Sequence, residues 1–313
     1  MYVGIDLGGT NIAAGLVNEN CEILRKDSVP TLPGRGPEAV VADMASLVMR
    51  LVPEDFLREG GIRSVGIGSP GSVDSAAGVI TFAANLGFVN LPLCEALASR
   101  LPGLPVYAEN DANAAALGES LAGAASGHSS AICVTVGTGI GCGIIIGGKI
   151  YSGCNGAAGE AGHHVIVYGG KPCTCGRLGC WESYASATGL IALTKEAMET
   201  HPDSRMRQIA EQRGKVSGRT AFDAMRDGDK AGREVVELYT RYLACGLANL
   251  VNIFQPEIIC LGGGISNEGE NLLAPLREMT ERECFKTGGT PAVLRRAVLG
   301  NDAGIIGAAM LRR

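Results

Sequence analysis

Three glycine-rich turns follow apolar runs in this sequence, and their residue types suit the binding of phosphate. They are Asp-Leu-Gly-Gly-Thr-Asn at residues 6–11, Thr-Val-Gly-Thr-Gly at residues 135–139 and Leu-Gly-Gly-Gly-Ile at residues 261–265. Glycine lets a backbone turn tightly and expose its N–H groups, which bind anions and phosphate above all. A single turn of this kind is as typical of a plain hairpin, whereas three in one chain favour a phosphate-binding protein.

A second group of reactive side chains has the spacing of metal ligands. Its pattern is H-x9-C-x-C-x4-C, formed by His163, Cys173, Cys175 and Cys180. Three thiolates and one imidazole are a usual tetrahedral set for zinc, and we expect the site to be structural. His164 is the alternative imidazole. The other eight of the eleven cysteines are scattered singly, several inside apolar runs where cysteine acts as a small buried hydrophobe.

A third candidate is the pair Asn110-Asp111, which stands where the apolar run VYA gives way to an Ala-rich helical segment. An isolated Asn-Asp pair at such a place is often only the N-terminal cap of the helix. A carboxylate there can also orient a hydroxyl group and accept its proton, while the Asn amide offers a donor and an acceptor to neighbouring hydroxyls. The pair by itself leaves both interpretations open.

The elements that must position these residues alternate between strands and helices. Helical patterns such as EAVVADMASLVMRLV and EVVELYTRYLACGLANLVNIF separate the strand-like runs, and this alternation predicts an α/β fold. Shifted by 128 residues, residues 9–17 lie over residues 137–145, which hints at a duplicated unit of strand, Gly-Thr turn and strand. We expect the polar segment at about 200–230 to be a solvated helical excursion. The strand-like runs lie at residues 2–7, 64–68, 104–108, 131–136, 143–146 and 257–261.

Composition limits the class of partner. The chain has 313 residues, enough for two domains with a core each, and its formal net charge of −5 comes without any cluster of Lys and Arg. This argues against a nucleic-acid surface. No signal peptide fits before Asp6, and no apolar run approaches the ~18 residues of a membrane span. We therefore expect a cytoplasmic protein that acts on a small molecule, with no nucleic-acid or membrane partner.

Taken together, the three turns and the His/Cys cluster resemble those of the ROK family of sugar kinases, within the superfamily of sugar kinases, actin and heat-shock chaperone ATPases. The resemblance covers the whole chain. It implies an α/β fold of two ribonuclease-H-like domains, of the actin-like ATPase type, that flank a cleft. We expect a smaller N-terminal domain at residues 1–112, completed by a C-terminal helix at 299–313. A larger domain at 113–298 then contains the zinc loop at 163–180.

The resemblance assigns the glycine-rich turns to ATP. The first turn approaches the nucleotide phosphates with Asp6 near Mg²⁺, the second clasps the phosphates from the other domain, and the third packs beside the adenosine. Backbone N–H groups and hydroxyls donate to phosphate oxygens, while a carboxylate holds the metal through water. The implied ATP-binding residues are Asp6, Gly8, Gly9, Thr10, Asn11, Gly137, Thr138, Gly139, Gly262, Gly263 and Gly264.

The resemblance also assigns Asp111 as the catalytic base, which orients the sugar hydroxyl and accepts its proton. The segments Gly159-Glu160-Ala161-Gly162-His163 and Cys180-Trp181-Glu182 match the family's sugar-binding signatures, and its zinc spacing favours His163 over His164. The implied substrate-binding residues are Gly71, Asn85, Asn110, Asp111, Glu160, His163 and Glu182.

His163 belongs to both the sugar group and the zinc group. A metal-bound imidazole keeps its second nitrogen as an N–H donor whose direction the metal fixes. We expect zinc to bind one nitrogen of His163 and a sugar hydroxyl to accept from the other. On this hypothesis, loss of zinc weakens sugar binding while ATP affinity changes little.

The activity implied is ATP-dependent phosphorylation of a hexose at its 6-hydroxyl, with Mg²⁺ bound to ATP and a homodimer as the family expectation. Glucose is favoured because ESYASATGL, residues 182–190, resembles the glucokinase branch. N-acetylglucosamine, N-acetylmannosamine and fructose remain alternatives to glucose, as do polyphosphate and ADP to ATP.

Two other classes of protein are weighed against a kinase. A ROK transcriptional regulator binds sugar without turning it over and carries a helix-turn-helix segment before the first phosphate turn, where Asp6 is here the sixth residue. An actin-like or chaperone-like ATPase would lack the constellation of Glu160, His163 and the cysteines. Both classes are disfavoured.

Overall fold

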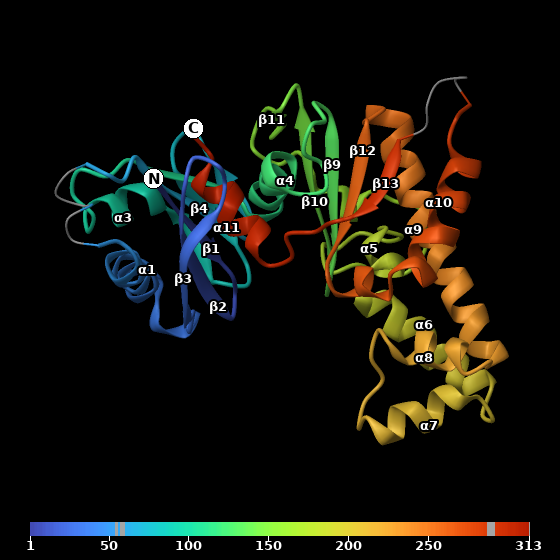
Figure 1. Cartoon of the computed structure of the whole chain (residues 1–313). Coiled ribbons are helices and arrows are strands. Elements are labelled where there is room, and N and C mark those ends of the chain that lie inside the picture. The colour runs from blue at the N-terminus through green and yellow to red at the C-terminus, as the bar shows by residue number, and fades with distance from the viewer. Residues whose placement is uncertain (54–55, 57–59, 287–291, 313) are drawn as a thin grey trace. The chain divides into compact units, whose positions relative to one another are not determined.

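The computed structural model, drawn in Figure 1, describes residues 1–53, 56, 60–286 and 292–312. Its backbone contacts divide the chain into two units. Unit 1 comprises Met1–Cys133, Gly143–Gly159 and Ala297–Arg313, and unit 2 comprises Val134–Cys142 and Glu160–Arg296. Among the described residues, every helix is too short or too polar to cross a membrane.

Unit 1 is built on a mixed five-stranded sheet. Strand β1 pairs antiparallel with β2 and parallel with β4, and β4 pairs parallel with β8. Alternate residues of β1 face opposite sides, so Val3, Ile5 and Leu7 join the core on the side of helix α1 (Pro37–Leu51). In spatial order the strands are β3 (Ile23–Pro30), β2 (Asn11–Val17), β1 (Tyr2–Leu7), β4 (Ser64–Ser69) and β8 (Val106–Asn110).

A small antiparallel sheet and a short helix complete the N-terminal part of unit 1. The sheet has the order β5-β6-β7, with Phe82 of β6 opposite Val89 of β7. The short helix α3 (Leu93–Ala98) contacts β8 and α1. The strands are β5 (Ser72–Asp74), β6 (Val79–Ala83) and β7 (Phe88–Leu91).

A second five-stranded sheet has the order β11-β10-β9-β12-β13, which matches the order β3-β2-β1-β4-β8 of the first sheet position by position. In both sheets a hairpin encloses a Gly-Thr turn, and the outer pair of strands on the far side is parallel. This topology supports the duplication inferred from the 128-residue shift. The strands are β9 (Ala131–Val136), β10 (Ile140–Ile146), β11 (Lys149–Ile150), β12 (Ile258–Gly262) and β13 (Val293–Arg296).

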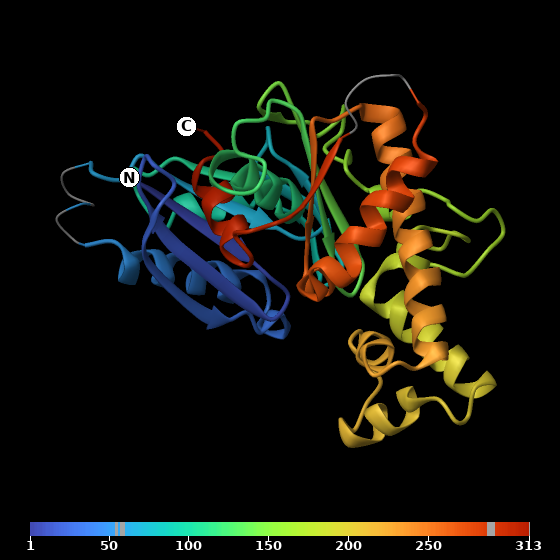
Figure 2. The ribbon, with the colours of Figure 1, turned by 45° about the vertical axis from the view of Figure 1, so that its right-hand side comes forward.

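The helices from η2 to α10 belong to unit 2. The long helices α9 and α10 lie side by side in both Figure 1 and Figure 2, and their residues are in contact. The polar segment near 200–230 is helical, as predicted, but it is not fully solvated, because α8 buries Ala221 and Phe222 where it packs on α9. The elements are η2 (Ala161–His163), α5 (Glu182–Ala185), α6 (Ala187–Thr200), α7 (Arg205–Gln212), α8 (Thr220–Arg226), α9 (Lys230–Phe254), η3 (Gly264–Glu268) and α10 (Glu270–Glu283).

The prediction of an α/β fold is confirmed, and each predicted strand run overlaps a strand of the structure. The domain boundaries inferred from the sequence stay a prediction. They differ from the two units mainly at residues 113–133 and 143–159, which belong to unit 1. The last helix, α11 (Asp302–Ala309), is part of unit 1, and residue 313 lies outside the described residues.

Helix α11 packs backbone to backbone against its neighbours in unit 1. In Figure 1 the red α11 lies against the blue β1, and its residues contact β1, β4 and α4 (Asp111–Ala122). A Cβ added at Gly66 of β4 would overlap the carbonyl oxygen of Ala308, and one added at Gly307 would overlap that of Ala114. These contacts need glycine because only a residue without a side chain lets two backbones approach so closely.

We predict that Gly307→Ala destabilises the protein, by about 1–3 kcal/mol, because an extra methyl group in a well-packed interior forces backbone shifts. Helix propensity alone predicts the opposite sign, a gain of about 1 kcal/mol for Ala over Gly in a helix. Urea unfolding of wild type and variant distinguishes the two. Gly34→Ala is the control, because a Cβ at Gly34 meets nothing within 4 Å. Equal or higher stability of Gly307→Ala would contradict the packing argument.

Candidate functional site

The first glycine-rich turn connects β1 to β2 in unit 1, and two hydrogen bonds fix its backbone. The Gly8 N–H donates to the Asn11 carbonyl at 2.9 Å, and Thr31 braces the turn by donating its hydroxyl to the Gly8 carbonyl at 2.6 Å. Gly9, Thr10 and Asn11 are exposed. A Cβ on Gly9 would lie 3.6 Å from that of Asn85, so the predicted sugar-side residue Asn85 lies beside this turn.

Two carboxylates, Asp6 and Asp111, lie close to each other at the sheet edge where β1 and β8 end. The pKa of Asp6 is raised to about 6, chiefly by burial and in part by the charge of Asp111, while Lys26 acts in the opposite direction. Burial also raises the pKa of Asp111, against hydrogen bonds such as that from the Ala112 N–H at 2.8 Å. A carboxylate with a raised pKa is a stronger proton acceptor, and a pair of them attracts a divalent cation.

Asn110 is the N-cap of α4, which settles the capping question raised by the sequence. Its Oδ1 accepts from the N–H groups of Ala112 and Asn113 at 2.9 and 3.2 Å, and its Nδ2 donates to the Gly71 carbonyl at 3.0 Å. Asp111 follows as the first helical residue. A hydrogen bond from the same side chain also lowers the pKa of Asp111, so both the oxygen and the amide group of Asn110 are engaged within the protein. The role of Asn110 as a substrate ligand stays a prediction.

Glu109 is a buried carboxylate that the sequence reasoning did not assign. Its side chain accepts from the Asn110 N–H at 2.9 Å, from Asn113 Nδ2 at 3.0 Å and from Ser75 Oγ at 2.9 Å. It therefore holds the backbone of the Asn110-Asp111 pair from inside the fold. The sequence contained a signal for this role, because Glu109 lies at the end of an apolar strand. A glutamate in such a place is seldom buried unless its carboxylate is paired with hydrogen-bond donors.

Gly71, at the turn before β5, has a φ of +88°, and a Cβ there would overlap the Phe82 carbonyl. Glycine is therefore the residue this position accepts, and its carbonyl receives the hydrogen bond from Asn110. The predicted residues of unit 1 thus gather around the ends of β1, β4 and β8. They are Asp6, Gly8, Gly9, Thr10, Asn11, Gly71, Asn85, Asn110 and Asp111.

The predicted metal ligands come together in unit 2. The ligand atoms of His163, Cys173, Cys175 and Cys180 all lie within 4.8 Å of one another. His163 Nδ1 is 3.6 Å from Cys173 Sγ, and the sulfurs of Cys175 and Cys180 are 3.6 Å apart. Tetrahedral zinc with bonds of about 2.3 Å to sulfur and about 2.0–2.1 Å to nitrogen separates its ligands by about 3.5–3.8 Å. The four side chains therefore fit a zinc ion.

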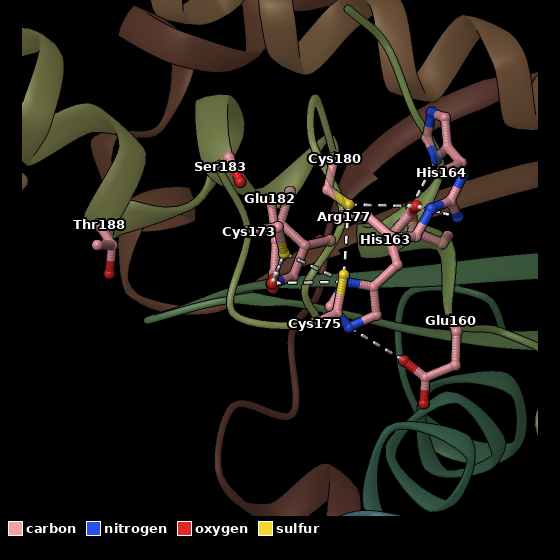
Figure 3. A network of polar contacts seen from close by, with 12 residues as sticks. Glu160, His163, His164, Cys173, Cys175, Arg177, Cys180, Glu182, Ser183 and Thr188 are labelled. Carbon is pink, nitrogen blue, oxygen red and sulfur yellow. Dashed lines mark hydrogen bonds and ion pairs between the residues drawn. The ribbon is translucent and has the colours of Figure 1, made fainter. Parts of the chain in front are cut away.

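Figure 3 shows how short loops turn these side chains inward. Between Cys173 and Cys180 the chain folds back, with the Cys173 N–H donating to the Arg177 carbonyl at 2.9 Å. The alternative ligand, His164, lies outside the cluster, because its Nε2 is 3.3 Å from Asn249 Nδ2 and its ring packs 5.2 Å from that of Trp181. His163, favoured by the family spacing, is the histidine that the structure brings to the cysteines.

The thiols respond differently to this crowding. Burial and, to a smaller extent, the neighbouring thiols together raise the pKa of Cys180 to about 12, whereas a backbone hydrogen bond associated with Arg177 lowers the pKa of Cys175. Burial also raises the pKa of Cys173. Three thiolates at such distances repel one another unless a cation lies between them, and this is the chemistry that a bound metal satisfies.

The two predicted sugar carboxylates flank the cluster but differ in their surroundings. His163 Nε2 is 3.9 Å from Glu160 Oε2, and the Glu160 side chain is 58% exposed. Glu182 is 16% exposed, with Oε1 accepting from the Cys173 thiol at 3.1 Å and Oε2 accepting from the Ile140 N–H at 3.3 Å. His163 Nδ1 thus faces the cysteines, and its Nε2 faces Glu160.

The second and third glycine-rich turns lie beside each other in unit 2. Gly137 donates its N–H to the Gly139 carbonyl at 3.0 Å, which closes the second turn. Gly263 has a φ of +84°, and a Cβ on it would overlap the Val136 carbonyl, just before that turn. Gly262 ends β12 and Gly264 begins η3. The backbone of the two turns is therefore packed too closely for side chains at Gly263.

Comparison with known proteins gives this chain clear relatives. It matches the model of the ROK family over residues 2–313. It is 40% identical to the glucokinase of Streptomyces coelicolor over 318 residues, covering 100% of this chain and 98% of the relative. It is also 34% identical to a putative xylose repressor of Caldicellulosiruptor sp. over 289 residues, which cover 92% of this chain and 71% of the repressor.

Among solved structures, the chain is similar to a ROK family glucokinase from Streptomyces griseus, crystallised in complex with glucose and AMPPNP. The two share 38% sequence identity with a TM-score of 0.80, covering 99% of this chain and 98% of the other. The likeness confirms the predicted fold of two ribonuclease-H-like domains of the actin-like ATPase type. The assignments of individual site residues stay predictions.

The pKa of Asp6 predicts a pH-dependent stability for the protein without nucleotide. An acid whose pKa is raised from about 3.9 to about 6 contributes stability that is complete below pH 4 and is lost as pH rises through 6. Asp6→Asn removes this loss. The free energy of unfolding of Asp6→Asn, relative to that of wild type, should therefore rise by about 2–3 kcal/mol between pH 4 and pH 7. Above pH 7 this difference should stay constant.

The measurement is urea unfolding of wild type and Asp6→Asn at several pH values. Asp203→Asn, at an exposed aspartate, is the matched control and should follow wild type across the range. A difference between Asp6→Asn and wild type that does not change with pH would show that Asp6 is ionised in the folded protein as it is in water.

Proposed function

The chain belongs to the ROK family, and we propose that it is an ATP-dependent glucokinase, which transfers the γ-phosphoryl group of ATP to the 6-hydroxyl of glucose. The observation that carries the proposal is the half-buried Asp111 at the start of α4. Burial raises its pKa, and hydrogen bonds to Glu109 and Asn110 hold the backbone on either side of it. Full-length similarity to named glucokinases supports the choice of sugar.

In the proposed reaction, Asp111 orients the 6-hydroxyl and accepts its proton. The hydroxyl oxygen forms a bond to the γ-phosphorus as the bond between that phosphorus and the β,γ-bridging oxygen breaks, and ADP leaves with that electron pair. Mg²⁺ bound with ATP supplies positive charge to the phosphates, and Asp6 is the residue of this chain that would hold it. The N–H groups and hydroxyls of the glycine-rich turns would donate to the phosphate oxygens.

Recognition of the sugar is proposed to use polar groups of Glu160, His163 and Asn110. The exposed carboxylate of Glu160 accepts hydroxyl donors, and the Nε2–H of His163 points toward the same region, since Nδ1 faces the cysteines. The amide of Asn110 donates to a hydroxyl near the base. A ring whose hydroxyls each donate and accept suits this alternation of acceptors and donors.

We further propose that the His/Cys cluster holds a structural zinc ion through His163, Cys173, Cys175 and Cys180. The support is the donor set and its tetrahedral spacing. Zinc there would fix the ring of His163 and thereby the direction of its Nε2–H. A homodimer, a cytoplasmic location and a place in glycolysis complete the proposal and rest on the family resemblance.

An assay that detects the sugar phosphate, run over a panel of sugars and phosphoryl donors, tests the function. We expect kcat/KM to be highest for glucose with ATP. N-acetylglucosamine, N-acetylmannosamine and fructose should each be poorer, because an N-acetyl group needs an apolar pocket and an amide partner that a 2-hydroxyl does not. A tenfold preference for an N-acetyl sugar would overturn glucose. Tight sugar binding without turnover would favour a regulator, and activity with polyphosphate or ADP alone would overturn ATP.

The control variant is Asp111→Asn, which keeps the shape of the side chain and removes the proton acceptor. Its kcat should fall by about 10²–10⁴-fold, with nucleotide binding retained. Near-normal turnover in this variant would show that another group is the base.

Removal of one thiol tests the metal. Purified protein should contain about one zinc per chain, and Cys175→Ala should lose it, because three ligands hold zinc far less tightly than four. We expect the variant to have a lower Tm and a higher KM for glucose. Cys154→Ala, at an exposed cysteine outside the cluster, should keep its zinc and its KM. Zinc lost from Cys175→Ala with KM and kcat for glucose unchanged would mean that the metal only stabilises the loop.

A further inference from the structure

Residues 182–190, which resemble the glucokinase branch, contact the second glycine-rich turn in unit 2. The Ala187 N–H donates to the Gly137 carbonyl at 2.8 Å. The Thr188 hydroxyl donates to the Thr138 carbonyl at 2.8 Å. Glu182 adds the hydrogen bond from the Ile140 N–H at 3.3 Å. Three successive anchors thus join the start of α5 and α6 to the turn between β9 and β10.

These anchors set the direction of the N–H groups in the turn. In a trans peptide the C=O and the following N–H point in opposite directions. When Ala187 holds the Gly137 carbonyl and Thr188 holds the Thr138 carbonyl, the N–H groups of Thr138 and Gly139 point away from α6. Within the described part of the chain, neither of these two N–H groups has an acceptor. Two such N–H groups side by side form an anion-binding nest.

We propose that Thr188 is a positioning residue for the phosphates of ATP, acting through the Thr138 carbonyl. This inference rests on the proposed function, because it assigns the second turn to the nucleotide. A glycine-rich turn has few side chains of its own to keep it in one conformation, so an outside hydroxyl that fixes a carbonyl lowers the entropy lost when phosphate binds.

The same segment connects the phosphate turn to the His/Cys cluster. Glu182 accepts from the Ile140 N–H with one carboxylate oxygen, and its other oxygen lies 3.1 Å from Cys173 Sγ. In Figure 3 Glu182 lies between Cys173 and the ribbon of the turn, with Thr188 further along the segment. These contacts change the expectation drawn from the sequence. Disturbance of the cluster should now raise the KM for ATP as well as the KM for glucose.

Thr188 separates the two effects, because it belongs neither to the proposed sugar ligands nor to the metal ligands, and its side chain is exposed. Thr188→Val keeps the β-branched shape and removes the hydroxyl. We expect the Kd for AMPPNP with Mg²⁺, measured by calorimetry, and the KM for ATP to rise about three- to tenfold, the effect of one lost hydrogen bond. The KM for glucose and the Tm should stay unchanged, and Thr188→Ser should restore wild-type values.

The matched control is Thr200→Val, the same substitution at the exposed last residue of α6, which should leave every value unchanged. An unchanged Kd for AMPPNP in Thr188→Val would overturn the inference. A parallel rise in both KM values with a lower Tm would overturn it too, because that pattern indicates general loosening of α6.

The nucleotide-binding assay also keeps this inference separate from the proposed function. Wild type that binds AMPPNP but does not phosphorylate glucose would refute the glucokinase, while the Kd of Thr188→Val would still decide the role of Thr188. Wild type that does not bind AMPPNP at all would overturn both.

Discussion

The close approach of α11 to β4 and α4 is the contact on which the rest of unit 1 depends. Helix α11, near the end of the chain, packs between the sheet and α4. At Gly66 and Gly307 the backbones lie so close that a Cβ atom would overlap the neighbouring backbone. With α11 in place, Asp6 packs beside Gly304 and Asp111 begins α4 nearby. The raised pKa of Asp6 is therefore a consequence of how the chain ends are packed.

In unit 2 the corresponding constraint is electrostatic and concerns the thiols of the His/Cys cluster. Three sulfurs and an imidazole crowd into a space that suits a cation, and the loop around them has little regular secondary structure. Its backbone is fixed instead by bonds such as that from Trp181 Nε1 to the Tyr242 carbonyl at 2.9 Å, which fastens the segment after the cluster to α9. In the proposed assignment, a metal held by the cluster would supply the order that so small a core cannot.

The contacts of Glu182 join these features to the chemistry of phosphate. The half-buried carboxylate of Glu182 lies 3.1 Å from Cys173 Sγ on one side and accepts from the Ile140 N–H, next to the second turn, on the other. In the proposed assignment, this side chain therefore connects a loop that binds sugar to a turn that binds nucleotide. Coupling of this kind needs no movement at a distance, because the two partners share one side chain.

The sequence by itself determined the α/β alternation, the repeated hairpin with its Gly-Thr turn, and the residue types of the metal cluster, because periodicity, turn chemistry and ligand spacing are local properties. Tertiary structure decided which atoms meet. It placed Nδ1 of His163 toward the cysteines, made Asn110 the helix cap, and buried Glu109 beneath it. It also joined Thr188 to the phosphate turn 50 residues earlier in the chain. Contacts at such separations depend on how elements pack, and no local pattern of residues encodes them.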